Sequence, residues 1–225
     1  MQRRKRATRP ARGEFTTLTW QWIARPSRQA RLPGHLAHIA WRGDARATGW
    51  YIAGMNDRSS MIRVDQAGEY GATRIYAGQL AVMGDRAPHS AEVRGMAEQE
   101  AAHLARFDAL MARRGTRPTA LQPVWSLAGY ALGAATALIG PEAAMACTAA
   151  VEEEIDRHYT RQLGELAEAG DDPELAGMIE EFREDERAHR DAALAAGAER
   201  APAYPLLHAA IRLGCRAAIR LSERI

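Results

Sequence analysis

The sequence reads QEAAHL over residues 99–104 and EFREDERAH over residues 181–189, and each stretch contains a Glu-x-x-His pair. Residues three apart on a helix differ by about 60° around the axis and about 4.5 Å along it, so both side chains can reach the same ion. Chance places such a pair in many chains of this composition, so the pairs alone are weak evidence for a site. The two pairs are Glu100 with His103 and Glu186 with His189.

A single core-facing glutamate precedes each pair by one predicted helix. Glu69 lies 31 residues before Glu100, and Glu152 lies 34 residues before Glu186. Four-helix dinuclear carboxylate proteins follow this plan, with one Glu from each of two helices and a Glu-x-x-His pair from each of the others. The alternative is surface acids in helical ion pairs. It fits other acids better, namely Glu153, Glu154, Glu165, Glu168, Glu180, Glu181 and Glu184.

The body of the chain, residues 59–225, is predicted to be helical throughout. Apolar residues recur there at spacings of three and four, and no stretch alternates as a strand does. Glycine and proline divide the body into segments. The expected helices cover about 60–83, 90–114, an apolar stretch ending at 140, 141 to about 171, 173 to about 196, and a last one from about 205 towards 225.

The six acids and histidines of this plan lie in otherwise mostly apolar stripes, where Lys and Arg are missing. A buried carboxylate without a partner costs several kcal/mol, so such a group is paired, protonated or bound to a cation. Four carboxylates and two imidazoles suit iron or manganese rather than a zinc–thiolate site. We expect Glu100 and Glu186 to bridge two ions. Glu69 with His103, and Glu152 with His189, would each complete one ion.

Several segments resemble the demethoxyubiquinone hydroxylase family of ubiquinone biosynthesis. They include RVDQAGEYGATRIYAGQ (63–79), QEAAHL (99–104), LGAATALIGPEAAMACTAAVEEEIDRHY (132–159) and EFREDERAH (181–189). The resemblance covers about 60–225 and implies an all-α, ferritin-like four-helix di-iron bundle with additional apolar and C-terminal helices. It also implies an O2-dependent monooxygenase that hydroxylates the ring of a polyprenylated demethoxy-benzoquinol, a 3-demethoxyubiquinol 3-hydroxylase.

The resemblance also assigns roles to residues. It implies two iron ions per chain, and it points to His158 and Tyr159 as electron-relay residues near them. Asp185 could orient a ligating histidine, although a plain surface position fits it equally well. The metal ligands carried over from the family are Glu69, Glu100, His103, Glu152, Glu186 and His189.

A binding protein is the alternative function: a ferritin- or rubrerythrin-like iron store or peroxide scavenger on the same six ligands. A rubredoxin-like cysteine quartet is missing, which argues against it. The chain has two cysteines, Cys147 and Cys215, which we interpret as small core residues. The expected partners are the demethoxyquinol and O2, a membrane lipid surface and possible other ubiquinone-biosynthesis proteins. We expect no nucleic acid.

Two segments bear on the membrane. Residues 118–141 carry no charge over 24 positions, but polar residues and glycines dilute them, so we expect a membrane-facing surface helix rather than a span. Bundle core is the other interpretation. The terminal helix places arginine every fourth residue from Arg212 to Arg224, and we expect this stripe to meet lipid head groups rather than acids of the body. The predicted location is peripheral, at the cytoplasmic face of a bacterial cell membrane or the matrix face of the mitochondrial inner membrane.

The first 58 residues differ from the body in charge. Residues 1–60 carry 12 Lys and Arg against 3 Asp and Glu, whereas residues 61–225 carry 18 against 25. We expect a poorly ordered basic extension of unknown role. It is either a product of a start codon placed upstream of Met55 or Met61, or an organellar transit peptide.

Overall fold

The computed structural model describes residues 45–224, with side chains from residue 58 onward. Within that range the regular elements are helices and no strand occurs, which confirms the all-α class. The elements are α1 (Ala45–Met83), α2 (Ser90–Arg114), α3 (Gln122–Ile139), α4 (Pro141–Ala169), α5 (Pro173–Ala195), the 3-10 turn η1 (Ala198–Arg200) and α6 (Tyr204–Ser222).

The helix ends follow the punctuation of the sequence. Gly115 closes α2 with a φ of 66°, a left-handed conformation that glycine adopts without strain, and its N–H donates to the carbonyl of Met111. Asp172 is the N-cap directly before α5, although its φ of 57° is unusual for a residue with a side chain. Its carboxylate accepts a hydrogen bond of 3.2 Å from the N–H of Leu175, which caps the helix.

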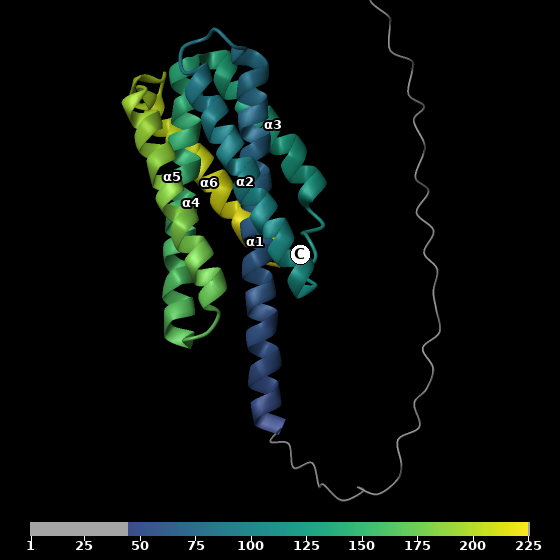
Figure 1. Ribbon diagram of the computed structural model, residues 1–225. Coiled ribbons are helices and arrows are strands. Elements are labelled where there is room, and N and C mark those ends of the chain that lie inside the picture. Colours follow the sequence, from purple (N-terminus) through teal and green to yellow (C-terminus); the bar gives the residue numbers. More distant parts are fainter. Residues whose placement is uncertain (1–44, 225) are drawn as a thin grey trace, which may run out of the picture. The chain divides into compact units, whose positions relative to one another are not determined.

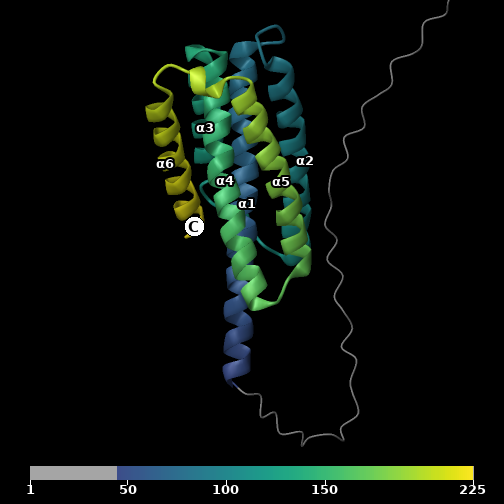
Figure 2. The same cartoon turned by 90° about the vertical axis from the view of Figure 1, so that its left-hand side faces the viewer.

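Helices α1 and α2 form one antiparallel hairpin and α4 and α5 form a second, and the four helices run side by side (Figures 1 and 2). Two apolar clusters fill the space between them. One contains Phe107 and Phe182, and the other contains Val93 and Met145. Along each of the four helices the buried acids and histidines lie between the residues of these two clusters. The bundle therefore has a polar layer enclosed by two apolar ones.

Helix α3 packs against α1 through glycines. A Cβ atom added at Gly133 would lie 1.9 Å from the carbonyl oxygen of Ile75, and one added at Gly78 would lie 2.1 Å from that of Tyr130. The two backbones are therefore in direct contact, which explains the small residues at spacings of four that the sequence shows in this segment. The opposite side of α3 is exposed, with Leu127 73% and Leu138 75% accessible.

Among the helices that the structure describes, none combines the length and apolarity that a bilayer crossing needs. One side of α3 meets the bundle, since Ala137 belongs to the buried cluster of Val93 and Met145 and Leu132 packs against a neighbouring cluster. Its other side is exposed at Leu127 and Leu138, and contact of that side with a membrane stays a prediction.

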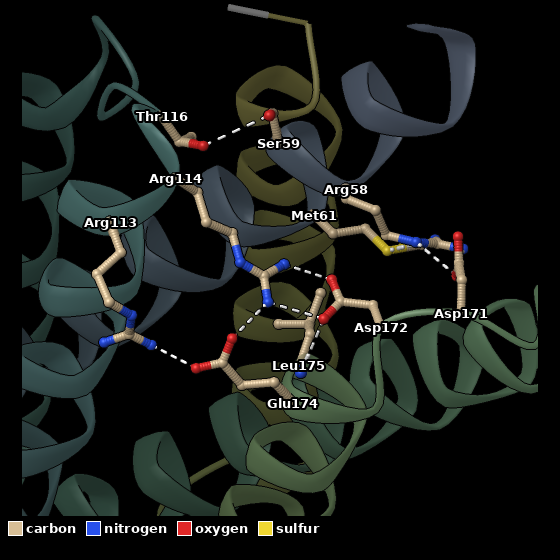
Figure 3. Close-up of polar contacts among 10 residues, drawn as sticks. All are labelled: Arg58, Ser59, Met61, Arg113, Arg114, Thr116, Asp171, Asp172, Glu174 and Leu175. Carbon is tan, nitrogen blue, oxygen red and sulfur yellow. Dashed lines mark hydrogen bonds and ion pairs between the residues drawn. The ribbon is translucent and has the colours of Figure 1, made fainter. Parts of the chain in front are cut away.

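Ion pairs join the two hairpins at the end where α4 turns into α5 (Figure 3). Arg114, at the end of α2, donates to both carboxylate oxygens of Asp172 and, at 2.9 Å, to Glu174. Arg113 pairs with the other oxygen of Glu174. Arg58 of α1 donates to Asp171 at 2.7 Å. We call this group of six residues the clasp.

The first helix begins earlier than the apolar spacing indicated. The backbone is helical from Ala45, whereas the sequence suggested a start near Ser60. Residues 45–59 lack the apolar period but also contain no proline, and a helix needs only its backbone hydrogen bonds to continue once it is nucleated. The prediction of a poorly ordered extension lies outside the described residues up to residue 44.

The prediction that the terminal arginine stripe meets lipid is wrong for its first two members. Arg212 and Arg216 both donate to Glu154 of α4, at 2.5 and 2.8 Å. Arg212 also lies 2.8 Å from Glu153. Glu154 was expected on a solvated face, yet it is 4% exposed. The reason is that α6 covers this side of α4, so the buried carboxylate takes its cations from α6.

Candidate metal centre

The six acids and histidines singled out in the sequence meet in one place. All are buried, with exposed fractions from 0 to 5%. Each bundle helix contributes, because the three-four spacing that buries the apolar residues turns these side chains inward as well. The set consists of Glu69 from α1, Glu100 and His103 from α2, Glu152 from α4, and Glu186 and His189 from α5.

The six residues form two overlapping groups of four. Each group offers four ligand atoms that all lie within 4.8 Å of one another, and Glu100 and Glu186 belong to both. Glu69 and His103 complete the first group, whereas Glu152 and His189 complete the second. The geometry thus matches the expected division into two shared and four separate residues, and the ligand assignment itself stays a prediction.

The two histidines present Nδ1 to the carboxylates. Nδ1 of His103 lies 3.4 Å from Glu186 Oε1 and 3.6 Å from Glu69 Oε2. Nδ1 of His189 lies 3.1 Å from Glu100 Oε1 and 3.4 Å from Glu186 Oε2. Both nitrogens are therefore turned towards the centre of the polar layer, where an ion would sit.

Many of the inward-facing atoms have no hydrogen-bond partner within the described residues. A buried polar atom left in this state costs about 1–3 kcal/mol, so native structures rarely keep one. Eight together indicate a site shaped for cations, and the residues present fit a pair of metal ions. The atoms are Oε2 of Glu69, both carboxylate oxygens of Glu100 and of Glu186, Oε2 of Glu152, and Nδ1 of His103 and of His189.

The electrostatics of the centre lead to the same conclusion. Burial, followed by repulsion from neighbouring carboxylates, raises the pKa of Glu100 and of Glu152 well above the ordinary value. Burial would lower the pKa of His103, but the carboxylates of Glu186 and Glu69 raise it to about 10. Burial lowers the pKa of His189. Without metal the chain must therefore hold protons among these carboxylates, and cations would replace them.

Two tyrosines and two polar side chains support the six residues. Tyr159 O–H donates to Glu69 Oε1, and Tyr76 O–H donates to Glu152 Oε1 at 2.7 Å. Burial and the nearby carboxylates raise the pKa of both phenols, so both keep the proton that they donate. Asp185 and Gln99 hold the outer nitrogens of the two histidines. The sequence left open whether Asp185 orients a histidine or is a plain surface residue, and its contact with His103 supports the orienting role.

His158 lies beside the centre rather than in it. Its Nε2 lies 3.0 Å from Asp65, its Nδ1 lies 2.9 Å from Arg161, and its ring centroid lies 6.0 Å from that of Tyr159. His158 also lines a polar cavity of about 450 Å³ between α4 and α6, together with four arginines and two glutamates. The pair of His158 and Tyr159 thus connects this cavity with Glu69, while their role as a relay stays a prediction.

Sequence reasoning missed several supporting residues. Asp65, 2% exposed, accepts hydrogen bonds from Gln162 and from His158. Its position four residues before Glu69, on the same helix face, was the available signal. Gln99 stands directly before Glu100, as Asp185 stands before Glu186, but its contact with His189 depends on how α2 and α5 are aligned.

An apolar cavity of about 530 Å³ lies between α1, α3, α4 and α6. Its walls are small and apolar side chains, with Trp125 at one side. Gly68 and Val151 line it, and they are the chain neighbours of Glu69 and Glu152. The cavity therefore runs beside the helix faces that carry the polar layer.

Comparisons with known proteins show which family the chain belongs to. The model of the family described as "Ubiquinone biosynthesis protein COQ7" matches residues 56–222. The chain is 53% identical over 164 residues to a 3-demethoxyubiquinol 3-hydroxylase of Rhodospirillum rubrum, a match that covers 73% of this chain and 76% of the relative. It is also 53% identical over 168 residues, with the same two coverages, to the NADPH-dependent 3-demethoxyubiquinone 3-hydroxylase, mitochondrial, of Mus musculus. A 5-demethoxyubiquinone hydroxylase of Saccharomyces cerevisiae is 42% identical over 179 residues, or 73% of this chain and 77% of the relative.

Proposed function

Because this chain belongs to the COQ7 family of ubiquinone-biosynthesis hydroxylases, we propose that it hydroxylates the ring of a polyprenylated demethoxyubiquinol at a ferritin-like di-iron centre. The bundle of α1, α2, α4 and α5 supplies the centre, and α3 and α6 are the additional helices. The observation that carries the proposal is the pair of overlapping Glu/His groups with their unpartnered inward atoms.

Charge balance supports two divalent ions. Within the described residues, Glu69, Glu100 and Glu186 have ion-pair contacts only with histidines, and Glu152 has none. Two Fe(II) ions would compensate the four negative charges, and hard-to-borderline oxygen and nitrogen donors suit iron. Glu100 and Glu186 would bridge the ions, with Glu69 and His103 completing one position and Glu152 and His189 the other. Two Fe(II) would supply electrons for the reductive activation of O2.

The apolar cavity is the proposed binding place of the quinol. Its walls offer a polyprenyl chain an environment free of charge, and its position beside Glu69 and Glu152 lets the ring approach the polar layer. Helices α3 and α6, which form two of its walls, also expose large apolar side chains. We propose that these residues rest on a lipid surface, from which the quinol enters, so that the protein is peripheral. They are Val124, Leu127, Leu138, Ile139, Leu206, Leu213 and Leu221.

Electrons would arrive through the polar cavity beside His158, which adjoins the apolar cavity at Ile219. The polar cavity beside His158 holds four arginines, a composition that suits an anionic reductant, and the mammalian relatives are named NADPH-dependent. From there His158 and Tyr159 lead to Glu69 through the contacts described above. The relay and the substrate thus reach the centre from different cavities.

Product analysis tests the function. The full chain is loaded with Fe(II) without oxygen, then given a short-chain demethoxyubiquinol, NADPH and 18O2. The proposal predicts about two irons per chain and a hydroxylated quinol that carries one labelled oxygen. Oxidation of bound iron without any labelled product would contradict it and favour the iron-storage alternative.

Tyr159→Phe tests the relay. The variant should keep the bound iron but slow the reduction of the ferric form by NADPH at least tenfold, because the phenol next to His158 is lost. Tyr76→Phe is the matched control, since it removes the equivalent hydrogen bond to Glu152 but lies away from the polar cavity. Stopped-flow absorbance of the ferric centre gives both rates. Equal rates in the two variants would remove Tyr159 from the relay.

A further inference from the structure

The outer nitrogens of the two buried histidines have chemically different partners. Nε2 of His103 lies 3.1 Å from Asp185 Oδ2, and Nε2 of His189 lies 3.1 Å from Gln99 Oε1. The distances are the same, so the difference lies in the acceptor alone. One histidine donates to a carboxylate and the other donates to a neutral amide.

Asp185 and Gln99 hold equivalent positions in a centre that is otherwise matched in its two halves. Asp185 precedes Glu186 and Gln99 precedes Glu100, and each reaches across to the histidine of the other pair. Each half also has one tyrosine that donates to its unshared glutamate. The two halves of the centre therefore match except at this position, where one half has the carboxylate of Asp185 and the other has the amide of Gln99.

Aromatic contacts hold the ring of His103 in place. The ring of His103 is stacked on Phe182, with centroids 3.9 Å apart and planes at 20°. Arg106 lies over the ring of Phe182, 4.6 Å from its centroid, and donates two hydrogen bonds of 2.7 and 2.8 Å to Glu181. These contacts fix the ring so that Nε2 stays directed at Asp185. Within the described residues, no comparable ring contact involves His189.

A hydrogen bond to a carboxylate is stronger than one to an amide and leaves more electron density on the imidazole. A more electron-rich imidazole binds a cation more tightly and favours the higher oxidation state. Resting on the proposed function, we infer that Asp185 and Gln99 make the two iron positions unequal. The position of Glu69 and His103 binds its ion more tightly and is oxidised more readily than the position of Glu152 and His189. Asp185 acts through His103 and is a positioning residue.

Isosteric changes of a single charge test this inference in the full chain. In Asp185→Asn both histidines donate to an amide, and in Gln99→Glu both donate to a carboxylate. The double variant exchanges the two acceptors, so that His103 donates to an amide and His189 to a carboxylate. Anaerobic Fe(II) titration against a chromophoric chelator gives the two binding steps. Mössbauer spectra of the 57Fe-loaded diferric protein report on the two positions without any turnover.

The parent should show two binding steps and two quadrupole doublets. Asp185→Asn should weaken the tighter step by about 10- to 100-fold and bring the doublets together, because outer partners of metal-bound histidines affect affinity to this extent. Gln99→Glu should tighten the weaker step, and the double variant should restore the separation. If Asp185→Asn does not fold, the convergence of the two steps in Gln99→Glu decides the question.

Two results would overturn the inference. One is a parent whose two irons bind with equal affinity and give a single doublet. The other is an Asp185→Asn or Gln99→Glu protein that keeps the separation of the parent. Both results would leave the di-iron function intact. A parent that binds no iron would instead overturn the proposed function as well, so the two failures are distinguishable.

Discussion

The α1–α3 contact and the α2–α5 contact pack helices in opposite ways. Between α1 and α3, glycines such as Gly78 and Gly133 bring the backbones together and leave no space for polar side chains. Between α2 and α5, the backbones stay apart and long side chains span the distance. The pairs along this seam are Gln99 with His189, His103 with Asp185, Arg106 with Glu181, Arg113 with Glu174, and Arg114 with Asp172.

This difference shows where the bundle makes room for a metal centre. A glycine contact maximises close packing but encloses nothing between the helices. A seam spanned by ion pairs leaves a layer in which four carboxylates and two imidazoles fit, and the same pairs orient both histidines. The apolar clusters on either side of the layer supply the burial that holds the wide seam together.

Forcing α1 and α3 apart by filling one of their glycine contacts should have the largest effect on stability. In Gly133→Ala the new methyl group would lie 1.9 Å from the carbonyl oxygen of Ile75, so α3 must move away from α1. We expect a loss of about 2–3 kcal/mol in the free energy of unfolding. The measurement is urea denaturation followed by circular dichroism.

Gly164→Ala is the control for this change, because its added Cβ meets nothing within 4 Å on an exposed face of α4. It should stabilise the chain by about 0.5–1 kcal/mol, since alanine is the better helix former. Equal effects of the two alanines would show that α1 and α3 do not touch as described.

Breaking the polar seam at the clasp should have an intermediate effect. Arg114→Gln removes the cation shared by Asp172 and Glu174, and Asp172 is also the cap of α5. We expect a loss of about 1–2 kcal/mol that shrinks in high salt. Denaturation at low and high salt measures it.

Arg113→Gln is the matched comparison, because Arg113 and Glu174 are both 58% exposed and solvent screens such a pair, so we expect a much smaller loss. A loss as large as that of Arg114→Gln would mean that exposure does not distinguish the two pairs.

The contact between α4 and α6 should make the stability of the fold depend on pH. Although burial opposes ionisation, Arg216 and Arg212 lower the pKa of Glu154 from 4.5 to about 2. A carboxyl group whose pKa is lowered by folding stabilises the fold above its unfolded-state pKa, and this stabilisation disappears as the pH falls towards the folded-state value. The parent should therefore exceed Glu154→Gln in unfolding free energy above pH 4.5 and lose that advantage between pH 4.5 and 2. A constant difference over this range would contradict the ion-pair assignment.

The six acids and histidines of the centre could be predicted from the sequence because their spacing is local to each helix. The spacing of Glu100 and His103 and their place in an apolar stripe follow from helix geometry alone, and the end of α2 at Gly115 follows from local turn chemistry. Glu154 was misjudged because its burial depends on α6, which lies more than fifty residues away in the chain. The same limit applies to Gln99, whose partner His189 is fixed only when the two hairpins align.

The iron content of Glu186→Ala tests the central claim most directly. Glu186 belongs to both groups of the centre, so its loss should affect both ion positions. Glu180→Ala is the matched control on the same helix, because Glu180 is exposed and pairs with Arg183 of α5 outside the centre. After anaerobic loading, the parent and Glu180→Ala should each hold about two irons per chain, and Glu186→Ala should hold fewer than one and form no hydroxylated product. Two irons per chain with normal turnover in Glu186→Ala would contradict the account.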